Sequence, residues 1–162
     1  MTSVSVPGPG TVPDTVMGAV EELRRGRPVI VVDAVDRENE GDLVMAAQFA
    51  TAEAVGFFVR WTSGLICSPM APEVAERLGL PLMVPHAGGV EATAFTVSVD
   101  AAGTGSGIGT ADRALTLRTL ADPGSGPERL IRPGHVFPLR ARPGGHPPRT
   151  PRTASAPPPP PA

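Results

Sequence analysis

Four carboxylates and one guanidinium lie close together in the segment Asp36-Arg37-Glu38-Asn39-Glu40-Gly41-Asp42. Acidic side chains at this spacing repel one another, so a bound cation or a polar substrate would lower the cost of ordering the loop. A solvated turn is the other explanation, because most runs of charge simply lie in water. Composition alone favours the solvated turn, and only the order of the residues argues for a site.

The acidic loop lies between two apolar runs, 28–34 and 43–47, which we predict to be strands. A helix is predicted over 14–25, where Asp14 can cap it and Gly26 can end it. No helix separates the two strands. This pattern favours an α+β fold, with a mixed twisted sheet covered by helices, over a doubly wound parallel sheet.

The rest of the chain alternates short apolar runs with helical patterns and turn residues. A second helix begins at Thr51 and stops near Gly64, and a glycine-rich loop spans 103–109. The other predicted elements are a strand at 65–67, a helix at 72–78, a strand at 95–99, a helix at 110–120 and a last strand at 135–139.

The totals describe one globular domain, which we place at 13–141 after a flexible lead of residues 1–12. A chain of 162 residues with 41% hydrophobic residues can bury a core. A net charge of −2 gives no electrostatic case for binding nucleic acid or an anionic membrane. No signal peptide or spanning run is evident, and the single cysteine, Cys67, excludes an internal disulfide. The expected location is the cytoplasm.

The segment 142–162 has a different character. Nine of these 21 residues are proline, and its apolar residues other than proline are alanines. Such a segment cannot contribute to a core, so it is predicted to be disordered or polyproline-like. A proline-rich motif for a partner is an alternative.

Six stretches follow one another in a collinear order: 36–42, 63–67, 80–84, 95–100, 110–113 and 132–140. Together they resemble 3,4-dihydroxy-2-butanone 4-phosphate synthase, an enzyme of riboflavin biosynthesis. The resemblance covers about residues 14–145. The acidic loop and the Arg-Pro-Gly-His-Val-Phe-Pro-Leu-Arg stretch at 132–140 are its most specific parts.

The resemblance implies a magnesium-dependent lyase, with manganese as an alternative metal. Its substrate would be D-ribulose 5-phosphate, which is enolised, dehydrated and rearranged before formate leaves. The product is a four-carbon phosphorylated ketone, and the chemistry needs proton transfer and metal stabilisation of an enediolate. The resemblance also implies a homodimer.

The resemblance assigns roles to residues of the acidic loop and to one histidine. Glu38 would bind magnesium and contact the substrate, which Arg37 and Asp42 would also contact. Asp42 and Glu40 would take part in proton transfer. His135 corresponds to a histidine that the family needs for activity, although a histidine hydrogen-bonded at a turn is the ordinary alternative.

Cys67 and Thr110 are candidate substrate-binding residues on the same resemblance. A cysteine at the end of an apolar strand is more often simply buried. The glycine-rich loop before Thr110 would bring backbone N–H groups near an anion. The family usually has serine where Gly109 stands, which removes a hydroxyl from this position.

The family's second magnesium ligand, a histidine in Arg-x-Gly-His-Thr-Glu, has no counterpart after Gly145. The chain reads His146-Pro147-Pro148-Arg149 there, and His146 is a poor substitute ligand. We therefore expect a chain truncated or frameshifted after about Gly145, with an incomplete sheet and impaired activity. The alternatives are a catalytically inactive fragment or a pseudo-enzyme that at most dimerises, and a metal binder unrelated to the family.

Overall fold

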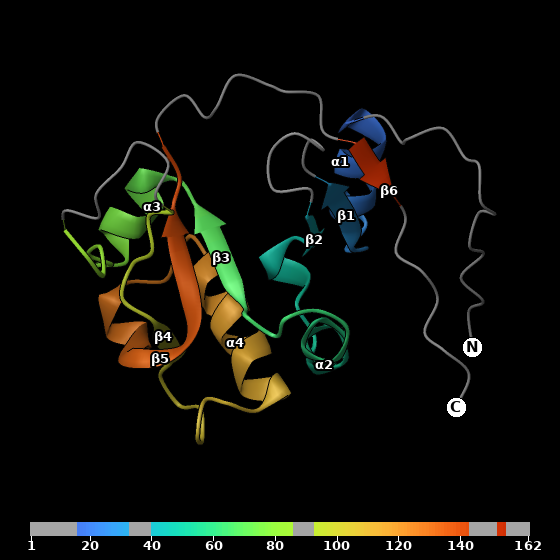
Figure 1. The fold of residues 1–162 in the computed structure, drawn as a ribbon. Helices are drawn as coiled ribbons and strands as arrows, with labels where there is room; N and C mark the ends of the chain where they lie inside the picture. Colours follow the sequence, from blue (N-terminus) through green and yellow to red (C-terminus); the bar gives the residue numbers. More distant parts are fainter. Residues whose placement is uncertain (1–15, 33–39, 86–92, 143–151, 155–162) are drawn as a thin grey trace. The chain divides into compact units, whose positions relative to one another are not determined.

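The computed structural model describes residues 16–32, 40–85, 93–142 and 152–154, with no side chains for the last range. It divides into two compact units: residues 1–46 with 148–162, and residues 47–147. Each unit is α+β, as the sequence predicted (Figure 1). The predicted limits at 13 and 141 do not coincide with this division and stay predictions.

The first unit contains helix α1 (Val16–Arg24) and an antiparallel sheet in the order β2-β1-β6. Strand β1 (Val29–Val32) pairs with β2 (Gly41–Val44), so Val31 lies opposite Asp42. Helix α1 ends where predicted, because Gly26 takes a positive φ of 73° that other residues adopt only under strain. The predicted cap, Asp14, lies outside the described residues.

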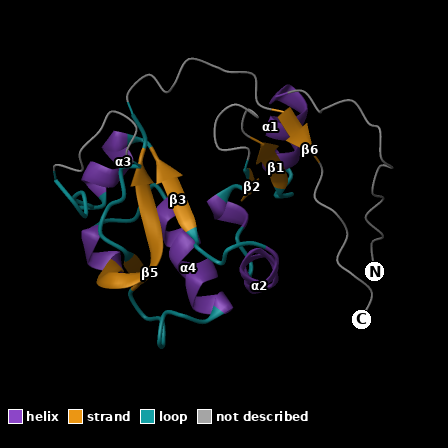
Figure 2. Ribbon diagram, viewed as in Figure 1, coloured by secondary structure: helices purple, strands orange, loops and turns teal. Residues whose placement is uncertain are grey.

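Strand β6 (Arg152–Ala154) corrects part of the prediction for the C-terminal segment. It pairs antiparallel with β1, with Ile30 opposite Ala154 (Figure 2). The sequence predicted no regular structure here because proline dominates the segment. These three residues contain no proline and can complete a backbone ladder along the edge of β1.

The second unit is built around a mixed sheet in the order β3-β5-β4. Strand β3 runs parallel to β5, and β4 runs antiparallel to it. Helix α4 packs against β4 and β5 and also contacts α2 (Figures 1 and 2). The elements of this unit are η1 (Ala47–Phe49), α2 (Ala52–Trp61), β3 (Cys67–Met70), α3 (Pro72–Arg77), β4 (Val99–Ala101), α4 (Thr110–Ala121), η2 (Pro127–Arg129) and β5 (Leu130–Arg140).

The core of the second unit lies between α4 and the sheet. Its apolar side chains come from α2, α3, α4 and all three strands or their ends, and most are almost fully covered. Phe95 and Phe137 pack edge to face beside it, with ring centroids 6.3 Å apart. The core residues are Ala50, Val55, Ile66, Ala75, Leu78, Leu80, Val99, Ala114, Leu117, Leu120, Leu130 and Val136.

The helix ends follow the local sequence closely. Thr51 is the N-cap of α2, and its hydroxyl accepts the N–H of Ala54 at 3.1 Å. After α4 the chain turns at Asp122, whose carboxylate accepts the N–H of Gly124 at 2.9 Å. This hydrogen bond is the main reason that the pKa of Asp122 lies below its usual value.

Four predicted strands have wrong limits. The strand predicted at 43–47 is β2, which begins at Gly41 and ends at Val44, and Ala47 already belongs to η1. Strand β3 begins where the predicted strand 65–67 ends and includes Pro69, which an edge strand tolerates. Only Val99 of the predicted strand 95–99 belongs to β4, while Phe95 and Thr96 form isolated bridges. Strand β5 is longer than 135–139, because a bulge absorbs the Pro-Gly pair that appeared to interrupt it.

Candidate active site

His135 lies in a bulge of strand β5. On β4, Val99 and Asp100 are consecutive, but their partners on β5 are Val136 and Ile131. Residues 132–135 are therefore extra on the β5 side of the ladder. A bulge re-aims side chains and releases backbone groups from regular pairing. Here the bulge places the His135 ring beside the Asp100 carboxylate.

Hydrogen bonds from Arg132 and Gly134 hold the bulge in place on both sides. The Arg132 guanidinium donates hydrogen bonds to the carbonyls of Leu78 at 2.6 Å and of Leu130 at 3.3 Å. Gly134 donates its N–H to Ser98 Oγ at 3.1 Å, and a Cβ at Gly134 would overlap the backbone of Val99. Glycine is therefore required here by the close approach of two backbones.

The carboxylate of Asp100 binds His135 twice. Its Oδ1 accepts the backbone N–H of His135 at 2.9 Å, and its Oδ2 lies 2.8 Å from His135 Nδ1. The Asp100 side chain is 9% exposed, whereas the His135 side chain is 39% exposed. A buried carboxylate thus holds a histidine whose ring still reaches the surface.

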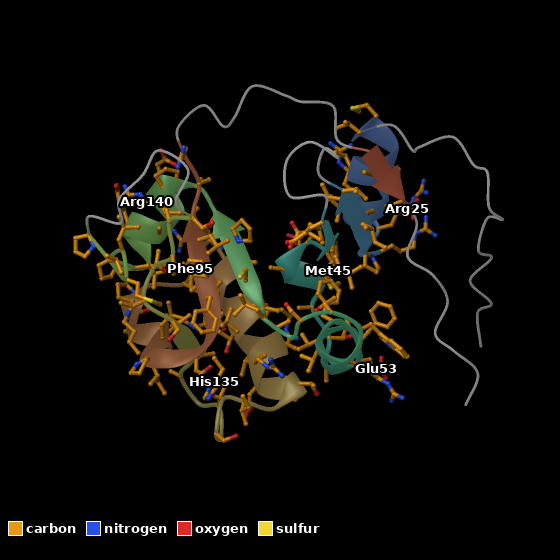
Figure 3. All side chains as sticks on the ribbon, viewed as in Figure 1. Arg25, Met45, Glu53, Phe95, His135 and Arg140 are labelled. Carbon is orange, nitrogen blue, oxygen red and sulfur yellow. The ribbon has the colours of Figure 1, made fainter. Side chains whose placement is uncertain are left out.

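Gly107 of the glycine-rich loop lies directly against this pair. A Cβ on Gly107 would overlap Asp100 Oδ2 and would lie 2.8 Å from His135 Nδ1. The residue has a φ of 78°, so both conformation and space require glycine. Figure 3 shows His135 on the side of β5 that faces the loop leading into α4.

One backbone donor of the glycine-rich loop already has an acceptor within the chain, and the anion site that the sequence predicted here stays a prediction. The N–H of Gly107 is donated to Asp112 Oδ2 at 3.1 Å, so the helix's own carboxylate takes this place. Gly109 is the N-cap of α4 and has no side chain to cap it. Thr110 is the first residue of the helix and is half-buried, with its methyl group near Gly56 of α2.

Helix α4 is tied to β4 by one buried hydroxyl. Thr116 Oγ1 accepts the N–H of Ala101 and donates to the carbonyl of Asp112, both at 2.9 Å. Thr116 is completely buried. Asp100, the loop and α4 are therefore held as one group around His135.

The predicted site residues that the structure describes are divided between the two units. His135 and Thr110 lie in the second unit, together with Cys67, which begins β3 half-buried opposite Phe137. Glu40 and Asp42 lie in the first unit, at the start of β2, and are exposed. Arg37, Glu38 and His146 lie outside the described residues.

Glu38, the magnesium ligand that the resemblance implies, lies outside the described residues. Among the described residues, no three histidine, cysteine, aspartate or glutamate side chains form a metal-binding group. In the same part of the chain, no helix has the length and apolar character needed to cross a bilayer.

Sequence reasoning missed Asp100 and Gly107. In the sequence, Asp100 stands at the end of a family stretch and Gly107 is one of several loop glycines. Their closeness to His135 depends on pairing between strands 35 positions apart in the chain. The available signal was an aspartate directly after an apolar strand, which is a position where a carboxylate can be buried only with a partner.

Comparison with known proteins decides the family. The family model for 3,4-dihydroxy-2-butanone 4-phosphate synthase matches residues 17–156. The chain belongs to this family. The match includes β6 and so extends beyond about residue 145, where the resemblance predicted from the sequence ends.

Curated relatives agree with this membership. A 3,4-dihydroxy-2-butanone 4-phosphate synthase from Neisseria meningitidis serogroup B is 52% identical over 125 residues, which is 76% of this chain and 34% of that protein. A riboflavin biosynthesis protein RibBA from Salinispora arenicola is 54% identical over 132 residues, covering 81% of this chain and 31% of that protein. The chain therefore spans about a third of the length of these relatives.

Solved structures share the fold. A 3,4-dihydroxy-2-butanone 4-phosphate synthase in complex with two magnesium ions has a TM-score of 0.79 at 48% identity, covering 82% of this chain and 62% of that one. The two-domain family member RibBX from A. baumannii has a TM-score of 0.76 at 38% identity, covering 82% of this chain and 39% of that one. The α+β fold is thus that of the family.

Proposed function

We propose that this chain carries the activity of its family, the conversion of D-ribulose 5-phosphate to 3,4-dihydroxy-2-butanone 4-phosphate and formate. The observation that carries the proposal is the family match over residues 17–156, which includes His135 and the acidic loop. The atoms of substrate and products balance without an oxidant or reductant. The reaction therefore needs proton transfer and charge stabilisation rather than a redox cofactor.

His135 is the proposed proton carrier. Its ring is held by a buried carboxylate and remains partly exposed, so it can exchange a proton with a bound sugar and with water. Asp42 and Glu40 are the further candidates for proton transfer, and their exposure leaves them accessible to a substrate. Arg37, Asp42, Cys67 and Thr110 are the proposed substrate contacts.

A divalent metal is part of the proposal, and the magnesium-bound relative supports it. Glu38 is the residue that would hold the metal, together with contacting the substrate. Carboxylate oxygen is the ligand type that magnesium prefers, and manganese accepts the same donors. When bound, the metal would stabilise the negative charge of an enediolate. The protein's own groups would then orient the sugar and move its protons.

Formate release from D-ribulose 5-phosphate in the presence of magnesium tests the proposal. His135→Ala is expected to lower kcat by about 10²–10⁴-fold, which is the usual contribution of a positioned acid or base. Glu38→Ala is expected to abolish turnover. Glu53→Gln, on the exposed first turn of α2, is the control and should leave the rate unchanged. Full activity in His135→Ala would contradict the role of this histidine.

A non-catalytic family member is the second candidate. It is favoured by the sequence His146-Pro147-Pro148-Arg149, which stands where the resemblance implies a metal-binding histidine followed by Thr-Glu. A folded chain that releases no formate with either magnesium or manganese would support this candidate. Formate release at a rate abolished by Glu38→Ala would reject it.

We further propose a homodimer in the cytoplasm, with D-ribulose 5-phosphate as its small-molecule substrate. Light scattering during size-exclusion chromatography tests the first point. A mass of twice 16.6 kDa is expected. A monomer at micromolar concentration would contradict it.

A further inference from the structure

Arg113, on helix α4, is a buried cation without an acceptor. Only 8% of the residue is exposed. Among the residues that the structure describes, its Nε is the one buried side-chain nitrogen or oxygen atom that lacks a hydrogen-bond partner. None of the ion pairs in the described part of the chain includes it. A guanidinium keeps its charge when it is buried, so covering it without an acceptor costs free energy.

Other arginines of the second unit show what a guanidinium ordinarily finds in this protein. Arg118, five positions further along α4, donates to the carbonyl of Ala50. Arg129 pairs with the carboxylate of Asp122 at 3.1 Å. A buried polar group that stays unpaired therefore needs an explanation, and a ligand that is not part of the chain is one.

The place of Arg113 on the helix favours a negatively charged ligand. It is the fourth residue of α4, and its N–H makes the first bond of the helix, to the carbonyl of Gly109 at 2.9 Å. The N–H groups of residues 110–112 before it have no acceptor within the helix, and Gly109 at the N-cap has no side chain to offer one. The positive end of the helix dipole lies in the same turn.

The guanidinium and these N–H groups are expected to lie close together. Side chains on a helix lean back toward its N-terminus, so the long side chain of Arg113 should cover the first turn of α4. Gly109 and Ala111 in this turn are exposed, so a small ligand can reach it. The nearby carboxylate of Asp112 accepts the N–H of Gly107 and forms no ion pair with Arg113.

We propose that Arg113 and the first turn of α4 bind an oxyanion, which is the phosphate group of a phosphorylated small molecule or inorganic phosphate itself. A phosphate group has several acceptor oxygens, so it can bind a planar guanidinium at two points and still accept backbone N–H groups. A sugar phosphate as the ligand rests on the proposed function. The binding of an oxyanion rests only on the unpaired Arg113 and its place on the helix.

Thermal unfolding of the full chain, with EDTA and without divalent metal, gives the first test. The unfolding midpoint should rise with inorganic phosphate, with D-ribulose 5-phosphate or with both, compared with chloride at equal ionic strength. The two compounds distinguish the free ion from the phosphorylated sugar as the ligand. No rise with either compound would overturn the inference, and so would an equal rise with D-ribulose, which has no phosphate group.

Arg113→Met gives the second test, because it keeps a long apolar side chain and removes the charge. Without phosphate its unfolding midpoint should equal or exceed that of the unaltered protein, since an unpaired buried charge is lost. Its affinity for phosphate should fall by about ten- to a hundredfold, the usual value of a hydrogen bond to a charged group. A lower midpoint in phosphate-free buffer would show that the guanidinium has an acceptor within the folded chain, and would overturn the inference.

Arg118→Met is the matched control on the same helix. It removes the same charge, but it also leaves the carbonyl of Ala50 without its donor. Its unfolding midpoint should therefore fall, while its affinity for phosphate, measured by isothermal titration calorimetry, should stay that of the unaltered protein. An equal loss of phosphate affinity in the two variants would show that net charge, rather than a site at Arg113, attracts the anion.

Formate release separates this inference from the proposed function. If both hold, Arg113→Met raises the KM for D-ribulose 5-phosphate by about ten- to a hundredfold. Phosphate binding that depends on Arg113, in a chain that releases no formate, would leave the inference standing and reject the family's activity. Formate release with unchanged affinity for phosphate and for the sugar phosphate in Arg113→Met would do the reverse.

Discussion

At the scale of single residues, the group around His135 is defined by two requirements that no motif states. Asp100 must be buried and Gly107 must lack a side chain, because backbone, carboxylate and ring meet at this point. Each residue taken alone has an ordinary explanation. Only their mutual contacts distinguish them from any strand aspartate or loop glycine.

Gly107→Ala is expected to destabilise the protein by more than about 1–2 kcal/mol, the usual cost of a positive φ for a residue with a Cβ. The additional loss comes from the overlap of the new methyl group with Asp100 Oδ2. Chemical denaturation measures the free energy of unfolding. The His135 ring signals should shift in the same variant.

Gly103→Ala provides the control for this prediction. Gly103 also has a positive φ, 89°, but a Cβ there would have nothing within 4 Å. The loss of unfolding free energy in Gly103→Ala should therefore come from the positive φ alone. Equal losses of unfolding free energy in the two variants would show that overlap of the new methyl group with Asp100 does not destabilise the protein.

At the scale of secondary structure, the contact between α4 and β4 depends on hydrogen bonds as well as on apolar packing. Thr116 is fully buried and serves both elements, so it holds the helix in register with the strand that carries Asp100. The apolar neighbours Ala114, Leu117 and Leu120 fill the rest of the interface. Apolar packing alone tolerates small shifts along the helix, whereas a hydrogen bond does not.

Thr116→Val should lower the free energy of unfolding by about 1–3 kcal/mol, because the buried N–H of Ala101 loses its acceptor. Thr116→Ser keeps the hydroxyl and should cost only about 0.8 kcal/mol for the lost methyl group. Thermal and denaturant unfolding of the two variants make the comparison. A valine variant as stable as the serine variant would contradict the role assigned to the hydroxyl.

At the scale of the whole molecule, the chain forms two units, and the first is made of segments from both ends of the sequence. Strand β6 occupies the edge of β1, which would otherwise present unpaired backbone groups. The C-terminal segment thus takes part in a sheet, although its composition predicts a chain without regular structure.

Removal of residues 148–162 should speed hydrogen exchange of the β1 amides that face β6 by about five- to tenfold. This change corresponds to about 1–1.4 kcal/mol less protection, the value of one backbone hydrogen bond. Exchange measured by NMR gives the result residue by residue, with the amides of β5 as the internal reference. Unchanged protection of Ile30–Val32 would show that β6 does not stabilise the sheet.

Local sequence determined where helices begin and end, because the interactions that fix a helix end involve residues close together in the chain. Thr51 and Gly26 mark helix ends because a hydroxyl can accept a free N–H and glycine can adopt a positive φ. The two strands predicted without a helix between them, β1 and β2, pair antiparallel, and the order of the family stretches in the sequence indicated the family. The magnesium ligand Glu38 and the substrate contacts of the acidic loop stay predictions.

Only the tertiary structure decided which groups meet. Asp100 and His135 are 35 positions apart, and their contact depends on a bulge whose length is set by the pairing of β4 with β5. The same holds for Gly107, whose neighbours come from two strands, and for β6, whose partner is more than a hundred positions away. Register and close approach are properties of packed backbones, so a one-residue change in pairing would alter every contact of His135 while leaving the sequence signals unchanged.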